Sequence, residues 1–227
     1  VYEIKYNASD SSRNNAVEVK RVVNVTDGTG PTITLIGSSN IVLEAGTSYN
    51  ELGAQAVDLS DNLTDQITIS GTVDNSTVGT YVLTYSVSDN SGNTSTIVRT
   101  VKVVDTTPPV MTLNGADEIT TEAGKIFIDP GAKSKDSIDG DLLVTAVSTV
   151  DTTRLGTYSI TYKSQDKSRN TSRITRKVTV IDTTGPLITL TGSQTVQLQR
   201  GSIYKEQGAI ARDFIDGVVP VTISGTV

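Results

Sequence analysis

The sequence contains no cysteine, histidine or tryptophan, and only 4% of its residues are aromatic. Without cysteine the chain has no disulfide, no thiol nucleophile and no thiolate metal ligand. Without histidine it lacks the commonest general base and the commonest metal ligand. The core must therefore be built from valine, isoleucine and leucine, and any metal site must use oxygen atoms.

Positive charge is also scarce, since 19 Lys and Arg face 25 Asp and Glu and give a net charge of −6. Nucleic-acid binding needs clustered cations, and the only mild concentration, at Arg173, Arg176 and Lys177, is explained by a solvated strand face. No apolar run is long enough to span a membrane as a helix. An acidic chain rich in Thr, Ser and Asn is typical of extracellular, cell-surface proteins, so we expect neither nucleic-acid binding nor membrane insertion.

Residues 79–93 read GTYVLTYSVSDNSGN, and their side chains alternate between large and small along the first ten positions. A period of two indicates a half-buried β-strand. The D-x-S-[GR]-N segment that follows is rich in turn-forming residues and leads into a second strand, which predicts a long β-hairpin. Copies of the pattern occupy residues 156–170 and 1–14.

The whole chain repeats. Asp27, Asp105 and Asp182 each end a hairpin and begin a short linker of Thr, Gly and Pro, at intervals of 78 and 77 residues. After each linker come an apolar run ending in Gly, a second short strand, a Gly-Ala pair preceded by an aromatic residue, and an acidic loop. We divide the chain into two complete repeats with parts of others at either end: 1–27, 28–105, 106–182 and 183–227.

Nothing in the repeat predicts a helix. About seven short strands in each repeat, separated by Gly, Pro, Asn and Asp, favour an all-β fold of tandem immunoglobulin-like sandwich modules. Proline fixes its own φ and restricts the residue before it, so the short linkers have little freedom. We therefore expect the modules to lie end to end.

An ordered series of motifs can be followed along the repeats, each complete in at least one of them: T-L-x-G, L-E-x-G, G-A, D-x-x-D-G, G-T-Y-x-x-T-Y and R-T-V-x-V-x-D. This series resembles the bacterial immunoglobulin-like surface repeats and is similar to hyalin-type repeats, over essentially the whole chain. The resemblance implies tandem modules of large secreted, wall-bound or surface-layer proteins, which act as spacers, adhesin stalks or accessory modules. It brings no catalytic residues with it.

Acidic residues gather in one loop of each repeat and at the tip of the last hairpin. In an immunoglobulin-type sandwich these two loops lie at the pole where the chain enters, so they should converge with the aspartate of the preceding linker. Carboxylate and amide oxygens are the ligands that calcium prefers. We predict calcium at the module junctions, with these candidate ligands: Asp27, Asp58, Asp61, Asp89 and Asn93; Asp105, Asp136, Asp139, Asp141, Asp166 and Asn170; Asp182, Asp213 and Asp216.

Two alternatives account for the same residues. Asp and Asn also occupy loops because they form turns and accept backbone hydrogen bonds. The spacing does not match the EF-hand pattern, and Val218 replaces in the third loop the last aspartate of the second, Asp141. A glycosidase acid/base pair needs a sugar-binding cleft, and no aromatic platform accompanies the clusters, so we expect no enzyme activity.

Other signals are weaker. N-x-[ST] triplets, which are glycosylation acceptors in some sources but also arise by chance in such a chain, begin at Asn7, Asn24, Asn62, Asn75, Asn93 and Asn170. Arg99 and Arg176 share strand parity with apolar residues, and an inward charge needs a partner unless the site is partly exposed. The second short strand should run beside the last one, which predicts Glu44 as the partner of Arg99 and Glu122 as the partner of Arg176.

The sequence therefore predicts a structural component of an extracellular assembly, such as a stalk, surface layer or filament, whose partners are copies of itself or flanking modules. The alternative is an adhesin or carbohydrate-binding accessory module that contacts a surface glycan or protein. The terminal segments 1–27 and 183–227 are complementary parts of a module. We expect a longer array to complete both; a head-to-tail exchange of the hairpin between subunits, which would build an open fibre, is the alternative.

Overall fold

A computed structural model describes residues 1–59 and 61–226, so the last residue of segment 183–227 lies outside it. The chain divides into two compact units, Val1–Asp105 and Thr106–Val227. In the described residues one 3-10 turn, η1 (Thr64–Gln66), is the only helical element, and every other element is a strand. No helix in this part of the chain has the length and apolar character needed to cross a membrane.

The first unit begins with a two-stranded antiparallel hairpin, followed by seven strands in two sheets. One sheet has the order β3-β5-β6 and the other the order β4-β9-β8-β7. The strands are β1 (Tyr2–Tyr6), β2 (Val19–Val23), β3 (Thr32–Leu35), β4 (Asn40–Glu44), β5 (Ala54–Asp58), β6 (Asp61–Asn62), β7 (Thr68–Ser70), β8 (Gly79–Ser88) and β9 (Thr94–Val104).

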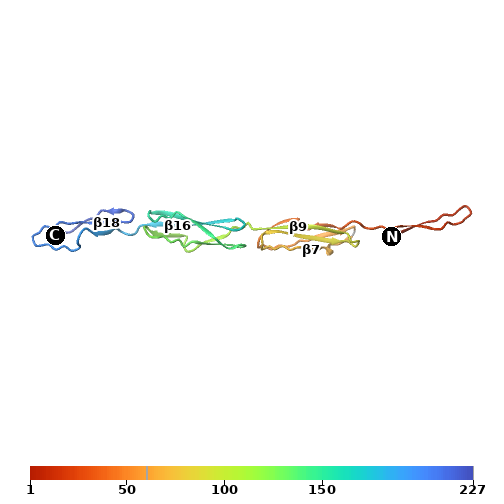
Figure 1. The fold of residues 1–227 in the computed structure, drawn as a ribbon, viewed down its shortest axis with the longest axis horizontal. Coiled ribbons are helices and arrows are strands. Elements are labelled where there is room, and N and C mark those ends of the chain that lie inside the picture. The colour runs from red at the N-terminus through yellow and green to blue at the C-terminus, as the bar shows by residue number, and fades with distance from the viewer. Residues whose placement is uncertain (60, 227) are drawn as a thin grey trace. The chain divides into compact units, whose positions relative to one another are not determined.

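The second unit repeats this sandwich with the sheet orders β10-β12-β13 and β11-β16-β15-β14, and adds a three-stranded sheet, β17-β18-β19. Figure 1 labels β9 and β7 of the first unit and β16 and β18 of the second. The strands are β10 (Val110–Leu113), β11 (Glu118–Glu122), β12 (Ala132–Asp136), β13 (Gly140–Leu142), β14 (Val144–Ser148), β15 (Gly156–Gln165), β16 (Thr171–Ile181), β17 (Leu187–Leu190), β18 (Ala209–Asp213) and β19 (Gly217–Val219).

The long hairpin predicted from the alternation is β8–β9, paired in register from Gly79↔Val103 to Ser88↔Thr94. Its inward residues Leu83 and Tyr85 are buried and pack with Ala54 of the opposite sheet. The hairpin therefore supplies one side of the core and the short sheet supplies the other. The same arrangement, with Tyr162 fully buried, recurs in the second unit.

The second short strand does run beside the last one, as predicted: β4 pairs with β9 and β11 with β16, both in parallel. The predicted partners of the arginines were nevertheless wrong. In this parallel register Glu44 lies opposite Val104 and Glu122 opposite Ile181, five residues beyond each arginine. The side chains that neutralise the arginines come from the loop before β5 or β12 instead.

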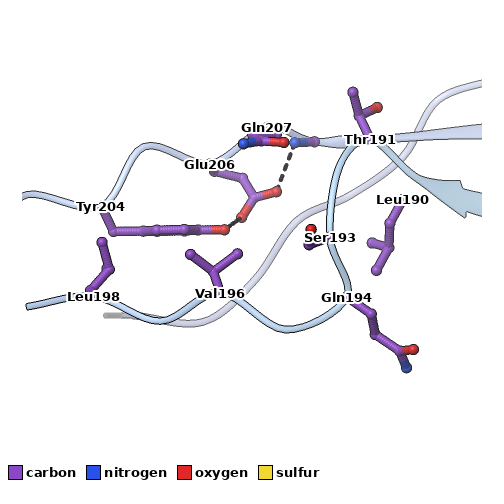
Figure 2. Close-up of a pocket in the computed structure, with 10 residues that line it drawn as sticks. Leu190, Thr191, Ser193, Gln194, Val196, Leu198, Tyr204, Glu206 and Gln207 are labelled. Atoms are coloured by element: carbon purple, nitrogen blue, oxygen red, sulfur yellow. Dashed lines mark hydrogen bonds between the residues drawn. The ribbon is translucent and has the colours of Figure 1, made fainter.

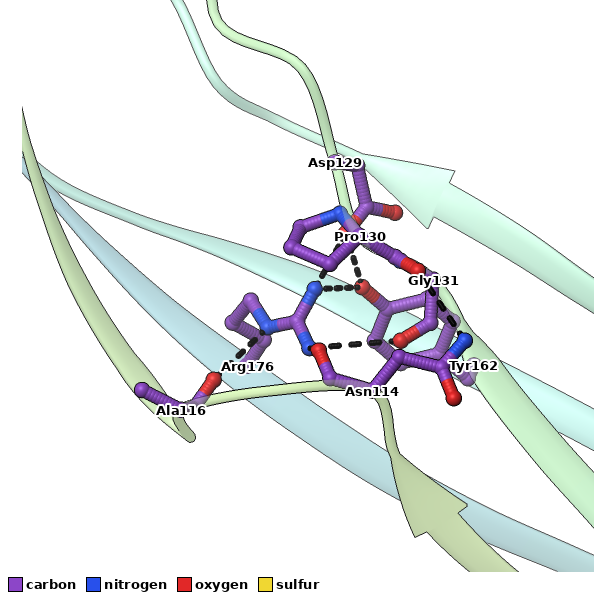
Figure 3. Close-up of polar contacts among 7 residues, drawn as sticks. All are labelled: Asn114, Ala116, Asp129, Pro130, Gly131, Tyr162 and Arg176. Atoms are coloured by element: carbon purple, nitrogen blue, oxygen red, sulfur yellow. Dashed lines mark hydrogen bonds and ion pairs between the residues drawn. The ribbon is translucent and has the colours of Figure 1, made fainter.

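Arg176 is fully buried at the centre of the second sandwich. Its guanidinium forms an ion pair with Asp129 and lies over the ring of Tyr162, 5.6 Å from the ring centroid. Figure 3 shows it donating hydrogen bonds to five acceptors: the Asp129 carboxylate, the Tyr162 hydroxyl, and the backbone carbonyls of Asn114, Ala116 and Gly131. Because a buried charge is costly unless paired and hydrogen-bonded, this network lets the core hold a cation.

Arg99 occupies the equivalent position in the first sandwich, paired with Glu51 and over the Tyr85 ring. Burial alone would raise the pKa of Glu51, but hydrogen bonds from Tyr49, the Gly53 N–H and Arg99 lower it to about 2. The Gly53 N–H donates to the Glu51 carboxylate, 2.6 Å away. Gly53 has φ +81°, a left-handed conformation that glycine adopts without steric cost. The acidic residue of the acid-x-Gly-Ala sequence is thus the ion-pair partner of the core arginine in both sandwiches.

Candidate metal centre

Three aspartates of the first unit meet at one pole of its sandwich. Asp27 precedes β3, Asp58 ends β5 and Asp89 follows β8, so each lies where a strand begins or ends. One carboxylate oxygen from each side chain lies within 4.8 Å of the others, and all three residues are half-buried. The convergence of the linker, acidic-loop and hairpin-tip aspartates is therefore present here.

Two of these carboxylates also stabilise local turns. Asp89 Oδ1 accepts the N–H groups of Ser91 and Asn93 at 2.9 and 2.8 Å, and its Oδ2 accepts the Asn93 amide at 2.8 Å. These hydrogen bonds, with that of the Asn93 side chain first, lower the pKa of Asp89. Asp27 Oδ1 accepts the N–H and hydroxyl of Thr29. Turn formation alone thus explains these two positions, and Asn93 positions Asp89 by presenting its amide nitrogen.

Asp58 has a different environment. Partial burial and then the negative charges of Asp27 and Asp89 raise its pKa. Asp61, opposite Asp58 across β5 and β6, adds to the repulsion. The Asp58 carboxylate therefore faces other carboxylates, and either a proton or a cation relieves that repulsion.

In the second unit Asp136 and Asp166 are the counterparts of Asp58 and Asp89. They are 3% and 6% exposed, and carboxylate oxygens of the two lie within 4.8 Å of each other. Asp136 Oδ1 accepts the N–H groups of Ile138 and Asp139, whereas Oδ2 is buried without a hydrogen-bond partner among the described residues. Burying an anionic oxygen without a hydrogen-bond partner costs free energy, so a bound cation or a proton would stabilise this atom. Asp105, the counterpart of Asp27 by the sequence period, is also buried.

Other candidate ligands point elsewhere. The Asp139 carboxylate accepts the Lys167 ammonium and N–H at 2.8 and 2.7 Å, and the ammonium hydrogen bond is the first cause that lowers the pKa of Asp139. Asp141 is exposed on β13 opposite Lys135. The Asn170 amide nitrogen donates to Asp166, as Asn93 does to Asp89. The structure thus brings a smaller set together than the acidic spacing predicts.

The third acidic loop has the same local geometry. Asp213 Oδ1 accepts the N–H groups of Ile215 and Asp216 at 2.8 and 2.9 Å, as Asp136 does in its own loop. Asp182 Oδ1 accepts the N–H of Thr184. The 227-residue sequence contains no counterpart of Asp89 for this loop, so only two of the three carboxylate positions are represented.

The third repeat also contains an open pocket of about 380 Å³ beside Glu206. In Figure 2 the Tyr204 hydroxyl donates to Glu206, which also accepts the N–H of Gly208, repeating the contacts of Tyr49, Glu51 and Gly53. In the first unit this acid binds the arginine of the long hairpin. The pocket therefore corresponds to the hairpin position of a complete sandwich, and we assign no ligand to it.

Sequence reasoning missed a second carboxylate contact, between Glu122 and the linker. Glu122 accepts the N–H and hydroxyl groups of both Thr183 and Thr184, at 2.8 to 3.0 Å. These hydrogen bonds, from the Thr183 N–H first, lower the pKa of Glu122 to about 2. The recurring pair of a strand-end glutamate and a Thr-Thr linker, Glu44 with Thr106 and Thr107 in the preceding repeat, is the signal that predicts it.

A sandwich of a short three-stranded and a long four-stranded sheet, repeated in tandem, is the architecture of immunoglobulin-like β modules. The family model described as "Bacterial surface protein, Ig-like domain" matches residues 33–103 and 111–180, more than half of the chain. The chain belongs to this family of immunoglobulin-like domains, and both complete sandwiches are its modules. The predicted resemblance and fold class are confirmed.

Relatives outside the family model are distant. An uncharacterized 81.3 kDa protein of Acholeplasma phage L2 is 32% identical over 177 residues, which cover 73% of this chain and 23% of the relative. Hyalin of Strongylocentrotus purpuratus is 31% identical over 195 residues, or 79% of this chain and 16% of hyalin. The chain thus spans less than a quarter of either relative. The lipoprotein BT2262 from Bacteroides thetaiotaomicron has a TM-score of 0.33 and 19% identity, with 70% of this chain and 85% of that one covered, too remote for argument.

Proposed function

We propose that this chain is a structural segment of an extracellular or cell-surface assembly, a stalk, surface layer or filament, and that calcium stiffens its module junctions. Membership of a bacterial surface protein family supports the location. The buried Oδ2 of Asp136, without a partner among the described residues and close to Asp166, carries the calcium part. The raised pKa of Asp58, which faces Asp27 and Asp89, gives independent support in the first unit.

Calcium suits these positions better than other ions. Hard carboxylate oxygens without nitrogen or sulfur ligands favour calcium or magnesium, and calcium tolerates the irregular geometry and variable ligand number of loop sites. Asp105, Asp136 and Asp166 follow Asp27, Asp58 and Asp89 by 78, 78 and 77 residues, so the repeat predicts an equivalent set. In the first unit, occupation of the set would join Asp27 of the linker to two loops of the following module and so tie the linker to that module.

The test is a comparison of calcium with chelator. Extracellular calcium modules bind with dissociation constants of about 0.1–1 mM. At 10 mM calcium such binding stabilises the folded state by about 1.4–2.7 kcal/mol, and each kcal/mol raises the melting temperature of a small domain by about 4–8 °C. We therefore expect calorimetry to show a rise of at least about 5 °C over EDTA, with saturable heat in calcium titrations.

Two variants separate a site from general screening of an acidic chain. Asp136→Asn should remove the calcium-dependent rise in the second unit, because it deletes the unpartnered carboxylate. Asp141→Asn is the matched control: it removes the same charge from an exposed residue of the adjacent strand β13 and should retain the rise. Identical melting in EDTA and in 10 mM calcium would reject the metal and leave the aspartates as turn formers.

An adhesin or carbohydrate-binding role is the second candidate. Sugar recognition through ring stacking needs exposed aromatic side chains. In the described parts of the two complete sandwiches, every Tyr and Phe is buried or half-buried. This observation favours the structural role over a stacking type of glycan site.

A further inference from the structure

The two complete modules differ sharply in the charge of their long hairpins. Hairpin β15–β16 carries six Lys or Arg side chains and one carboxylate, although the chain as a whole has a net charge of −6. Hairpin β8–β9 carries two cations and one carboxylate. Positive charge is therefore concentrated on one module rather than spread with the repeat.

Three of these six cations have nearby carboxylate partners within the second unit. Arg176 pairs with Asp129 inside the core, Lys167 with Asp139 at the pole, and Lys177 with Glu118 on β11. Local ion pairing accounts for these three, and none of them requires an external partner.

Of the other three cations, Arg169 lies in the turn between the two strands, whereas Lys163 and Arg173 lie on the strands themselves. They lie directly opposite each other on β15 and β16, both exposed, and neither forms an ion pair among the described residues. Like charges in a directly opposed cross-strand pair destabilise a sheet. The corresponding pair in the first module is Ser86 opposite Thr96, so the fold does not need cations at these positions.

The first hairpin of the chain provides an instructive contrast. Lys5 and Lys20 are also directly opposed across β1 and β2, but carboxylates of Glu3 and Glu18 lie 2.8 to 3.9 Å from them. Carboxylates thus neutralise the opposed pair Lys5 and Lys20, whereas Lys163 and Arg173 have no ion-pair partner among the described residues, and we call these two the open pair.

The neighbours of the open pair on the four-stranded sheet carry hydroxyl groups. Thr145 lies beside Lys163 on β14, and Thr161 opposite Thr175 forms the next row. Lys177 follows four residues after Arg173 on the same strand, about 13 Å further along. Cations and hydroxyls therefore form an open strip rather than a pocket, and we call Thr145, Thr161, Lys163, Arg173, Thr175 and Lys177 the basic strip.

We propose that the basic strip binds a linear polyanion of the cell surface, in which acidic groups recur along a hydroxylated chain. Arg173 can hold a carboxylate or phosphate through two parallel hydrogen bonds, and Lys163 supplies a second charge beside it. The hydroxyls of Thr161 and Thr175 can hydrogen-bond to neutral oxygens, whereas the Thr145 hydroxyl donates to the Lys163 carbonyl. A single exposed ion pair contributes little, so affinity requires repeated acidic groups. This goes beyond the proposed structural role and does not depend on calcium.

Nucleic acid fits the strip poorly. The strip lies on a four-stranded sheet, whereas the major groove admits a two-stranded ribbon, and no aromatic side chain belongs to the strip to stack with single-stranded bases. The polymer's acidic groups are carboxylates in an acidic polysaccharide and phosphates in a phosphate polymer. Both present the same charge chemistry to Lys163 and Arg173, so the experiment includes one probe of each kind.

The experiment measures retention of the whole chain on immobilised polygalacturonate and poly(glycerol phosphate), in EDTA, at several salt concentrations. We expect binding to at least one probe that weakens steeply with salt, and no binding to neutral dextran. The Lys163→Ser/Arg173→Thr variant should bind at least tenfold more weakly, with a log–log salt slope smaller by about 1.4 if each contact contributes about 0.7. Preference for either probe identifies the acidic group and supports the proposal.

The matched control is Lys5→Ser/Lys20→Thr, which removes the same two charges from the neutralised pair. It should bind like the unmodified chain. An equal loss of affinity in both double variants would show that binding depends only on net charge, and would contradict a specific site at the basic strip. Lys163→Ser/Arg173→Thr should also melt at the same or a higher temperature, because repulsion is relieved. Retention of duplex DNA equal to that of both probes, or no retention on either probe, would likewise overturn the proposal.

Discussion

Replacing Arg176 by Met tests how the core of the second module is held together. The variant keeps the apolar stem but removes the guanidinium, which leaves Asp129 and three backbone carbonyls without their donor. Breaking a buried pair by removing one partner costs about 3–5 kcal/mol, because the remaining charge is uncompensated. Arg176 is fully buried but the Asp129 side chain is 28% exposed, so solvent can partly stabilise the remaining charge. We therefore expect the free energy of unfolding to fall by about 3 kcal/mol, near the lower end of that range.

Calorimetry of the whole chain provides the readout. For a domain of this size each kcal/mol corresponds to about 4–8 °C, so the transition of module 106–182 should fall by at least about 12 °C. The transition of module 28–105 serves as an internal control and should not move.

Combining Arg176→Met with Asp129→Leu distinguishes pairing from packing. Removing both partners together leaves no stranded charge, so the double variant should be more stable than the sum of the single losses predicts, with a coupling of about 2 kcal/mol. Losses below about 1 kcal/mol for Arg176→Met, or additive losses in the double variant, would refute a buried ion pair as the organising contact of this core.

Two further outcomes follow from the same carboxylates. The pKa of Glu51 is lowered from 4.5 to about 2, so its contribution to the free energy of unfolding should be complete above about pH 4.5 and lost as the pH falls towards 2. Glu51→Gln should therefore make the free energy of unfolding, measured in urea, depend less on pH across that range. An unchanged pH dependence would contradict the assignment. Glu122 accepts four hydrogen bonds from Thr183 and Thr184, and Glu122→Gln should weaken them. Amide hydrogen exchange at Thr183 and Thr184 should therefore become faster, while exchange within β15 stays unchanged. Equal protection of the two threonines in both proteins would show that the contact does not stabilise the linker.

Periodicity made the fold predictable from the sequence. Alternation along residues 79–88 determines which side chains of β8 face the core, and Leu83 and Tyr85 are buried as that pattern requires. The partner strand of β9 was also predictable, because the order of strands follows from the fold class. The prediction that failed was Glu44 as the ion-pair partner of Arg99. In the parallel register Glu44 lies opposite Val104, five residues beyond Arg99, and no local sequence pattern specifies that register.

The acidic pole was predictable in outline only. We expected the aspartates of the linker, the acidic loop and the hairpin tip to converge, because strand ends in a known fold share a pole. In the structure one carboxylate oxygen of each of Asp27, Asp58 and Asp89 lies within 4.8 Å of the others. The sequence cannot say where each carboxylate points. Asp139 and Asp141 follow Asp136 closely, yet one is held by Lys167 and the other lies on the outer face beside Lys135. Side-chain direction in a tight turn depends on dihedral angles that the amino-acid spacing does not encode.

The parallel pairing of β4 with β9 has a mechanical consequence. The linker enters at the Asp27 pole through β3 and β4, whereas β9 runs to the opposite pole and leaves there. A force that separates the two ends of a module pulls these neighbouring strands in opposite directions along their length. Five residue pairs, from Asn40↔Thr100 to Glu44↔Val104, then bear load together instead of opening one after another. A module of this kind should resist stretching far better than its thermal stability suggests, which single-molecule force extension would measure directly.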